Sequence, residues 1–438
     1  MKKQILIIGG TGKMGQFFIP IFKKHEFSVL IWGKSGRRDI AEKMGVEFAE
    51  DLDFAIKKSD IVIISVPIDK TESTIKECAP KMKKGSLLMD FTSLKVKPIQ
   101  TMLKFAPMGV EVIGTHPMFG HSIPSMEGQI VILAPTDRCN EWFPIINSIF
   151  EKEGAHIEIM DAALHDEFTS IIQGLTHFAY IAIGTTFKRL DFNISESKRF
   201  MSPVYDILID FVGRILGQNP YLYASIQMEN PNIKIVHESF IAECKELSEI
   251  VTQQDMNSFI KKMRSASQHF GDTSGSQRRS DELINLKQNK IDTLINLIGK
   301  EIGLYHVHSK ITHIGKLEQV NSKQIIISKN NKSISFKMEN VRLLSNNELR
   351  AWKINHLTHK IRDISVWIPN GADAQVILNI ISLDERLEFV KIKDKYCLNE
   401  KISITYRLNI IDEQDIEKVV EKVEQLLVGI GCEIRTKS

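Results

Sequence analysis

The chain has 438 residues, more than one hydrophobic core usually serves, which predicts two to three domains. With 43% hydrophobic residues, 25% charged residues and a mean hydropathy of -0.11, its composition is that of a globular protein and excludes the disordered and fibrous classes. The formal net charge is only +3, and no block of five like charges occurs, so we expect small-molecule chemistry and no nucleic-acid partner.

The first ten residues form a short apolar run after two lysines and offer no small-residue cleavage site, so they predict a strand and not a signal peptide. The longest apolar runs, such as Ile61 to Ser65, are far shorter than the ~20 residues of a membrane helix. The five cysteines form no Cys-x-x-Cys pair: Cys78, Cys139, Cys244, Cys397 and Cys432. We therefore expect a cytoplasmic protein with no membrane contact.

Between Gln4 and Gly154, continuous apolar runs alternate with helical segments. Runs without polar alternation are typical of strands that are covered on both faces. The predicted strands are Ile5–Ile8, Val29–Trp32, Ile61–Val66, Leu87–Phe91, Val110–Gly114 and Ile130–Ala134. Six such strands with helices between them predict a Rossmann-type, doubly wound parallel sheet, an α/β domain that covers residues 1–155.

A glycine-rich turn follows the first predicted strand directly and opens a helix. In its G-x-G-x-x-G spacing, Gly10 is expected to permit the tight turn, Gly12 to admit a pyrophosphate, and Gly15 to allow close helix packing. The alternative is a turn that binds no ligand. Pro20 lies inside the predicted helix and should kink it, at a cost of ~3 kcal/mol. The predicted contacts of this turn with the cofactor are Gly10, Thr11, Gly12, Lys13, Met14 and Gly15.

The end of the second predicted strand indicates which dinucleotide to expect. NAD enzymes usually place Asp or Glu there to bind the adenosine ribose, but this chain has Gly33. The cations and hydroxyl that follow can hold a 2′-phosphate, so we expect NADP, with NAD as the alternative; an ordinary solvated basic loop is the other interpretation. These residues are Lys34, Ser35, Arg37 and Arg38, and Val66 and Pro67, where the third predicted strand ends, complete the expected cofactor contacts.

Two polar clusters follow neighbouring predicted strands, where ligands of open α/β sheets bind. One runs from Asp90 to Lys95 and the other from Thr115 to Gly120, so Ser93 and His116 are expected to face one cavity. A histidine suits general-base chemistry because its ordinary pKa of ~6.5 lies near working pH. A purely structural loop histidine is the alternative interpretation of His116.

Helical periodicity replaces strand signals beyond Asp161 and predicts an all-α domain for residues 156–300. The segment Ile171–Ile183 is apolar nearly all round, which predicts a subunit interface and hence a homodimer. Residues Gly271 to Ser280 should break the pattern before a last helix at Glu282–Gly299. The other helical segments are Asp161–Arg189, Val204–Leu216 and Ile233–Glu249.

The last third of the chain predicts an α+β region with two modules. Short alternating strands (Ile311–Leu317, Gln324–Ser328, Ser333–Met338) indicate a small β module over residues 301–350. Residues 361–438 then show the order of a ferredoxin-like βαββαβ unit. Its elements are Ile364–Ile368, Ala372–Ile381, Leu387–Ile392, Ile402–Ile410, Asp415–Val428 and Cys432–Arg435. His306, His308 and His313 lack an accompanying Cys or carboxylate ligand set, so no metal site is predicted.

The two polar clusters, Asp-x-x-Ser-x-Lys and His-Pro-Met-Phe-Gly, resemble the signature of prephenate dehydrogenases, the enzymes of tyrosine biosynthesis. The resemblance covers about residues 4–288 and continues in Ile172–Phe178, Ser202–Tyr205, Val212–Arg214 and His269–Asp272. It implies oxidative decarboxylation: hydride leaves C4 of prephenate for the nicotinamide while CO2 leaves C1, which gives 4-hydroxyphenylpyruvate.

The resemblance also implies roles for five side chains. His116 would take the proton of the substrate 4-hydroxyl, and Ser93 would orient that imidazole and touch the hydroxyl or the nicotinamide. Arg214 would bind the ring carboxylate, His177 would line the pocket, and Lys95 would add positive potential. Spacing alone favours other roles: a surface ion pair with the residue four before Arg214, a buried hydrogen-bond network around His177, a turn cap at Ser93 and a solvated charge at Lys95.

The substrate is less clearly indicated, because the chain departs from the enteric members of the family. His121 and Ser122 stand where those have Pro and Asp, and Asp206 stands where they have Arg. Ser122 offers no acidic partner for the ammonium of arogenate, which favours prephenate as substrate. The alternatives are an arogenate or another β-hydroxyacid-type dehydrogenase and, from another class, a non-catalytic nucleotide-sensing protein.

The ferredoxin-like unit resembles ACT-type regulatory modules. Tyrosine is therefore a hypothetical feedback effector, and a module that only extends the dimer is the alternative, because a fold does not fix a function.

Overall fold

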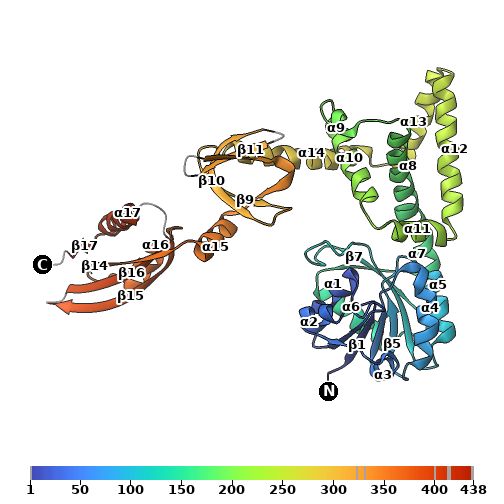
Figure 1. The fold of residues 1–438 in the computed structure, drawn as a ribbon, viewed down its shortest axis with the longest axis horizontal. Coiled ribbons are helices and arrows are strands. Elements are labelled where there is room, and N and C mark those ends of the chain that lie inside the picture. Colours follow the sequence, from blue (N-terminus) through green and yellow to red (C-terminus); the bar gives the residue numbers. More distant parts are fainter. Residues whose placement is uncertain (1, 322–323, 330–331, 399–400, 412–415, 436–438) are drawn as a thin grey trace. The chain divides into compact units, whose positions relative to one another are not determined.

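The computed structural model describes residues 2–321, 324–329, 332–398, 401–411 and 416–435 (Figure 1). They group into two compact units, Met1–Ser274 and Gly275–Ser438, and each is described by itself below. The finer division into four domains stays a prediction. Within the described residues, no helix is both long and apolar enough to cross a membrane.

The first unit contains an eight-stranded sheet in the order β3-β2-β1-β4-β5-β6-β7-β8. From β3 to β6 all neighbours are parallel, in the strand order of a doubly wound dinucleotide-binding sheet, which confirms the predicted fold class. The bounds are β1 Gln4–Ile8, β2 Ser28–Trp32, β3 Glu47–Phe48, β4 Ile61–Ile64, β5 Leu87–Asp90, β6 Glu111–Pro117, β7 Ile130–Pro135 and β8 His156–Ile159.

One edge of this sheet differs from the prediction. Strand β7 is antiparallel to β6, and the connection over residues 118–129 contains no helix. Antiparallel neighbours need no crossover helix, so the expectation of a helix between every pair of strands is wrong here. The two short strands β3 and β8 were not predicted either.

Helices cover both faces of the sheet (Figure 1). One face carries α1 (Lys13–Lys24), α2 (Arg38–Met44) and α6 (Trp142–Lys152), and the other carries α3 (Leu52–Lys58), α4 (Ile68–Cys78) and α5 (Val96–Phe105). Alternate residues of β1 enter the two cores, Ile5 and Ile7 on one side and Leu6 and Ile8 on the other, which explains the continuous apolar run. Helix α1 continues through Pro20, which lies exposed.

The rest of the first unit is helical, as predicted. Helix α7 passes into α8 through a π-helical turn, Ser170–Leu175. No residue of α8 is buried, and Ile171 and Ile172 are each about half exposed. The helices are α7 Ala162–Thr169, α8 Thr176–Arg189, α9 Ile194–Ser197, α10 Pro203–Leu216, α11 Pro220–Glu229, α12 Ile233–Thr252 and α13 Met256–Phe270.

The predicted break over Gly271–Ser280 is wrong for most of its length. Gly271 has a φ of +81° and ends α13, but the next helix, α14, already begins at Thr273 and runs to Ile295. Glycine alone adopts this left-handed conformation without strain, so Gly271 suffices to end the helix. The polar residues after it continue as helix.

The second unit contains two antiparallel sheets. The first has the order β12-β11-β10-β9-β13. The second, β15-β16-β14-β17, carries α16 and α17 and has the strand order of the predicted ferredoxin-like unit. Asp415, at the predicted start of the last helix, lies outside the described residues. The bounds are β9 Glu301–His306, β10 Thr312–Val320, β11 Gln324–Lys329, β12 Lys332–Lys337, β13 Val341–Leu343, α15 Asn346–His356, β14 His359–Ile368, α16 Ala374–Ile381, β15 Leu387–Leu398, β16 Lys401–Ile411, α17 Ile416–Gly429 and β17 Glu433–Ile434.

Candidate active site

The glycine-rich turn lies between the ends of β1 and β4, where the strand order of the sheet reverses. The tight turn is made by Gly9, with a φ of +87°, and not by Gly10 as expected; a Cβ at Gly9 would lie 2.2 Å from the Ser65 carbonyl oxygen. Gly10 instead allows close approach to Ile31, where a Cβ would lie 2.7 Å from that side chain. A Cβ at either position would clash with its neighbours, so both Gly9 and Gly10 are required for steric reasons.

The same turn is suited to binding an anionic cofactor. Gly12 is the N-cap of α1 and offers no side-chain cap, so the first N–H groups of the helix can donate to a pyrophosphate. Gly15 packs on the turn, since a Cβ there would lie 2.6 Å from the Gly10 Cα. Val66 lies against Gly9, and Pro67 caps α4 beside it. The structure thus brings the predicted turn and the Val66–Pro67 pair together at one crevice.

Steric crowding at the end of β2 explains why no carboxylate occupies position 33. A Cβ at Gly33 would lie 2.2 Å from Thr11 Oγ1, so the phosphate turn itself fills this space. Lys34 and Ser35 are exposed in the loop that follows. Of the two arginines, Arg37 pairs with Asp39, with Nη2 2.6 Å from Oδ2, and Arg38 pairs with Glu50.

The structure contradicts the alternative of a solvated charge at Lys95. Its side chain is 0% exposed and its Nζ forms an ion pair with Asp90, while its charge still lowers the pKa of His116. A contact of Lys95 with substrate stays a prediction. The Lys95 Nζ also donates to the Thr115 carbonyl oxygen at 2.9 Å, and the Thr115 N–H donates to Asp90 Oδ1 at 3.2 Å. This Asp90–Lys95 ion pair therefore joins the carboxyl ends of β5 and β6.

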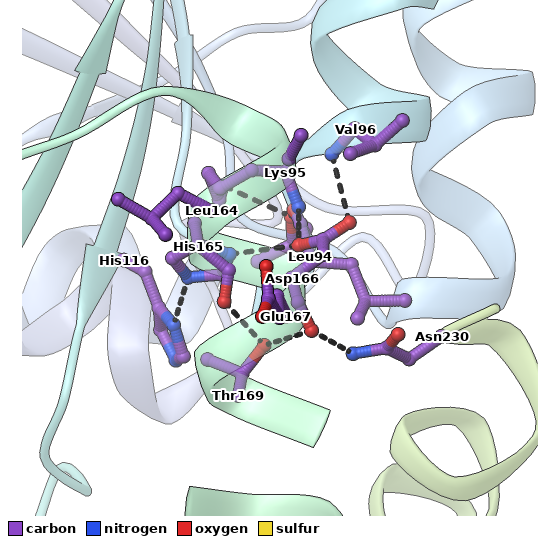
Figure 2. A network of polar contacts seen from close by, with 12 residues as sticks. Leu94, Lys95, Val96, His116, Leu164, His165, Asp166, Glu167, Thr169 and Asn230 are labelled. Atoms are coloured by element: carbon purple, nitrogen blue, oxygen red, sulfur yellow. Dashed lines mark hydrogen bonds and ion pairs between the residues drawn. The ribbon is translucent and has the colours of Figure 1, made fainter. Parts of the chain in front are cut away.

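His116 is 2% exposed near the end of β6 and belongs to a chain of three buried side chains (Figure 2). Its Nδ1 lies 2.8 Å from His165 Nε2, and His165 Nδ1 lies 2.7 Å from Asp166 Oδ1. The Asp166 carboxylate also accepts hydrogen bonds from the backbone N–H groups of Lys95 at 2.8 Å and Val96 at 3.0 Å. Sequence reasoning missed His165 and Asp166, although an adjacent histidine and aspartate at the start of the helical region were a usable signal.

Residues other than Ser93 hydrogen-bond the His116 ring in this structure. Ser93 is half-buried in the turn between β5 and α5, and in the described part of the chain His116 is bonded by His165 and Gln173, not by Ser93. Contact of Ser93 with a substrate hydroxyl or with the nicotinamide stays a prediction.

The other side of the His116 ring faces the π-helical turn. Gln173 Nε2 lies 3.4 Å from His116 Nε2, and four residues later His177 contacts the Tyr223 ring at 4.4 Å between centroids. Eight buried side-chain atoms of the described residues have no hydrogen-bond partner, and three of them belong to this helical region: Gln173 Oε1, His177 Nδ1 and Gln227 Oε1. Buried polar atoms normally find partners, so this group indicates the place of a bound polar molecule.

Arg214 extends the same group of residues. It lies exposed on α10, close enough to Tyr223 that its charge lowers the pKa of that phenol, against the larger effect of burial, which raises it. Ser122 lies exposed in the loop after β6, and its contact with substrate stays a prediction.

Burial controls the protonation of the histidines. It lowers the pKa of His116 well below 6.5, and the neighbouring His165 and Lys95 lower it further. Burial also lowers the pKa values of His165, against the opposing effect of Asp166, and of His177. His116 is therefore neutral at pH 7 and able to accept a proton.

Among the described residues, no three His, Cys, Asp or Glu side chains are arranged to hold a metal ion, the histidines of β9 and β10 included.

Comparison with known proteins agrees with this geometry. Residues 21–159 match the nucleotide-binding domain of prephenate dehydrogenase, and residues 161–265 match its dimerization domain. A probable arogenate/prephenate dehydrogenase of Methanocaldococcus jannaschii is 39% identical over 99% of this chain and 98% of its own, and the T-protein of Haemophilus influenzae is 31% identical over 62% and 68%.

A crystal structure of prephenate dehydrogenase from Aquifex aeolicus, solved with hydroxyphenyl propionate and NAD+, superimposes with a TM-score of 0.50. It is 20% identical and covers 62% of this chain and 99% of that one, a likeness that supports the fold. With both domains matched and a relative similar along its whole length, the chain belongs to the prephenate dehydrogenase family.

Proposed function

We propose that this protein is a prephenate dehydrogenase that converts prephenate to 4-hydroxyphenylpyruvate in tyrosine biosynthesis. The observation that carries the proposal is His116: a neutral, buried imidazole at the carboxyl end of β6, with one nitrogen bonded to His165 and the other turned toward unpaired polar atoms. Family membership supplies the reaction, and the site supplies a base in the state that the reaction needs.

The residues of the site divide the work as follows. His116 Nε2 accepts the proton of the 4-hydroxyl as hydride leaves C4. Arg214 binds the ring carboxylate through charge-assisted hydrogen bonds until it departs as CO2. His177 and Tyr223 form the wall between these two groups. The glycine-rich turn would hold the pyrophosphate of the dinucleotide, whose oxidised nicotinamide would supply the hydride acceptor.

The function is tested by initial rates of reduced cofactor formation from prephenate and from arogenate, each with NADP and with NAD. Turnover of prephenate that His116→Asn abolishes would support the proposal. Cofactor binding without turnover of either substrate would refute it in favour of a nucleotide sensor. Faster turnover of arogenate would refute the choice of prephenate, for which the argument is Ser122 in place of an acidic residue.

We propose NADP as the preferred cofactor. Gly33 replaces the acid that binds an NAD ribose, and Lys34 and Ser35 are exposed beside it. Arg37 is paired with Asp39, but both side chains are more than half exposed, and such surface pairs contribute only ~0–1 kcal/mol, so a 2′-phosphate can take over the guanidinium. A higher kcat/KM with NAD than with NADP would refute the preference.

We propose that the enzyme is a homodimer formed through its helical region. Helix α8 has no buried residue, and large apolar side chains lie exposed on the other helices of this region, for example Phe200, Tyr221, Met228, Met263 and Phe270. Apolar surface of this extent is typical of an interface. Light scattering coupled to gel filtration should give twice the chain mass.

Feedback by tyrosine through the ferredoxin-like unit stays a prediction, which initial rates with and without tyrosine would test.

A further inference from the structure

The hydrogen bonds of Asp166 determine which ring nitrogen of His165 carries the proton. Asp166 Oδ1 accepts from the Lys95 N–H and Oδ2 from the Val96 N–H, so both oxygens act as acceptors. His165 Nδ1, 2.7 Å from Oδ1, must then be the donor of that hydrogen bond. A neutral imidazole carries one proton, which leaves a lone pair on His165 Nε2.

The lone pair on His165 Nε2 determines the tautomer of His116. His165 Nε2 lies 2.8 Å from His116 Nδ1, and a lone pair can only accept, so His116 must carry its proton on Nδ1. The lone pair of His116 is consequently on Nε2. Gln173 agrees with this, because its amide Nε2, a donor, is the atom that faces His116 Nε2. At 3.4 Å that contact is long, and a substrate hydroxyl can displace it.

We infer that His165 and Asp166 are positioning residues that hold His116 as its Nδ1–H tautomer, so that Nε2 is the atom that takes the substrate proton. The inference deepens the proposed function and rests on the role of His116 as base. When Nε2 receives a proton, the charge of the imidazolium is stabilised through His165 by the Asp166 carboxylate.

Among the described residues, the other charged groups near the two rings are Lys95 and Asp90, which pair with each other; Asp90 also raises the pKa of His165, as Asp166 does. His165 of α7 faces His116 directly, and Gln173 of the π-helical turn is neutral. Lys95, from the turn before α5, also influences the His116 ring, but its charge is paired with Asp90. Asp166 is therefore the carboxylate that can balance a proton on His116.

The proton positions can be measured without turnover, by 15N NMR of protein labelled in its histidine rings. The His116 signals are assigned by their loss in His116→Asn. We expect the wild type to carry the proton on Nδ1. In Asp166→Asn, the carboxylate charge is lost and one of the two acceptor oxygens becomes a donor, so His165 Nδ1 is no longer held as the protonated nitrogen and a measurable fraction of His116 should carry its proton on Nε2. Glu167→Gln is the matched control: it makes the same change one residue later, at an exposed position, and should leave the signals unchanged.

Kinetics provide the second readout. Asp166→Asn should lower kcat by about 10²–10⁴-fold, the range expected when a general base is lost, and should move the acidic limb of the pH–rate profile to lower pH. Glu167→Gln should change neither. If Asp166→Asn does not fold, two variants of His165 decide: His165→Gln keeps an oxygen that can accept from His116 Nδ1 and should retain more activity than His165→Ala.

The outcomes separate the two proposals. A wild type with the His116 proton on Nδ1 but without dehydrogenase activity would refute the proposed function and support the tautomer. A wild type with the proton on Nε2 would overturn the inference whatever its activity. An unchanged tautomer and pH profile in Asp166→Asn, or equal losses in His165→Gln and His165→Ala, would overturn it as well.

Discussion

Two carboxylates lie buried where β5 and β6 end, and they serve different purposes. Asp90 accepts hydrogen bonds from Thr92 and Thr115 and forms an ion pair with Lys95, so its charge is balanced within this closed cluster. Asp166 begins an open cluster, a chain that ends at His116 Nε2, beside Gln173 Oε1, which has no partner in the described structure. Burial and charge are common to both clusters. What distinguishes the open cluster is that it ends at a neutral imidazole, which can accept a proton.

The largest expected effect comes from replacing His116, the last residue of the open cluster. His116→Asn should lower kcat about 10²–10⁴-fold, because proton abstraction by the imidazole is lost. The thermal midpoint should change little, since the amide can still reach His165. Initial rates and a thermal melt on one preparation check both statements. Full activity in this variant would contradict the role of His116.

Breaking the closed cluster should instead reduce stability. Lys95→Met leaves Asp90 buried without its cation, which should lower the free energy of unfolding by about 3–5 kcal/mol. Lys97→Met, an exposed position two residues later, is the matched control and should stay within about 0.5 kcal/mol. Urea denaturation measures both. Equal stability of the two variants would show that the ion pair contributes nothing net.

Arg214 lies close to Tyr223, and its replacement should affect binding. Arg214→Gln removes a charge-assisted hydrogen bond worth about 1.5–3 kcal/mol, so kcat/KM for prephenate should fall by about 10–150-fold. Arg264→Gln makes the same change on the exposed side of α13 and should leave kcat/KM unaltered. A loss of similar size in both variants would argue against a specific carboxylate contact.

The cofactor preference should respond to the loop after β2. Lys34→Ala should raise KM for NADP by roughly tenfold or less, because an exposed phosphate contact is screened by solvent, and should leave KM for NAD unchanged. Equal changes for both cofactors would contradict a 2′-phosphate site at Lys34.

The smallest effect concerns pH. Burial lowers the pKa values of His116 and His165, so the folded protein keeps both rings neutral below pH 6.5 while the unfolded chain takes up protons. The acidic limb of kcat/KM should therefore lie below pH 6.5, and the thermal midpoint should fall as the pH is lowered from 6.5 toward 5. A midpoint that rises on acidification would contradict these shifts.

The sequence was informative where a residue's type and its surroundings point to the same structure. Unbroken apolar runs such as Ile61–Ile64 identified buried parallel strands, and the order of strands and helices identified the ferredoxin-like unit. The antiparallel edge at β7 was missed because periodicity does not reveal strand direction. The burial of Lys95 was not predicted because a lysine is usually exposed, and only the folded chain brings Asp90 to its ammonium. His165 and Asp166 were missed because 49 residues separate His165 from the histidine it contacts.

The close approach of Thr11 and Gly33 limits how this enzyme can change its coenzyme. The simplest route toward NAD, an aspartate at position 33, would place a side chain where the Thr11 hydroxyl already lies. Gly33→Asp alone should therefore damage the binding of either coenzyme, and only a chain that first acquires a smaller residue at position 11 can benefit from it. The order of the two substitutions, and not only their identity, decides whether such a lineage or an engineering campaign can succeed.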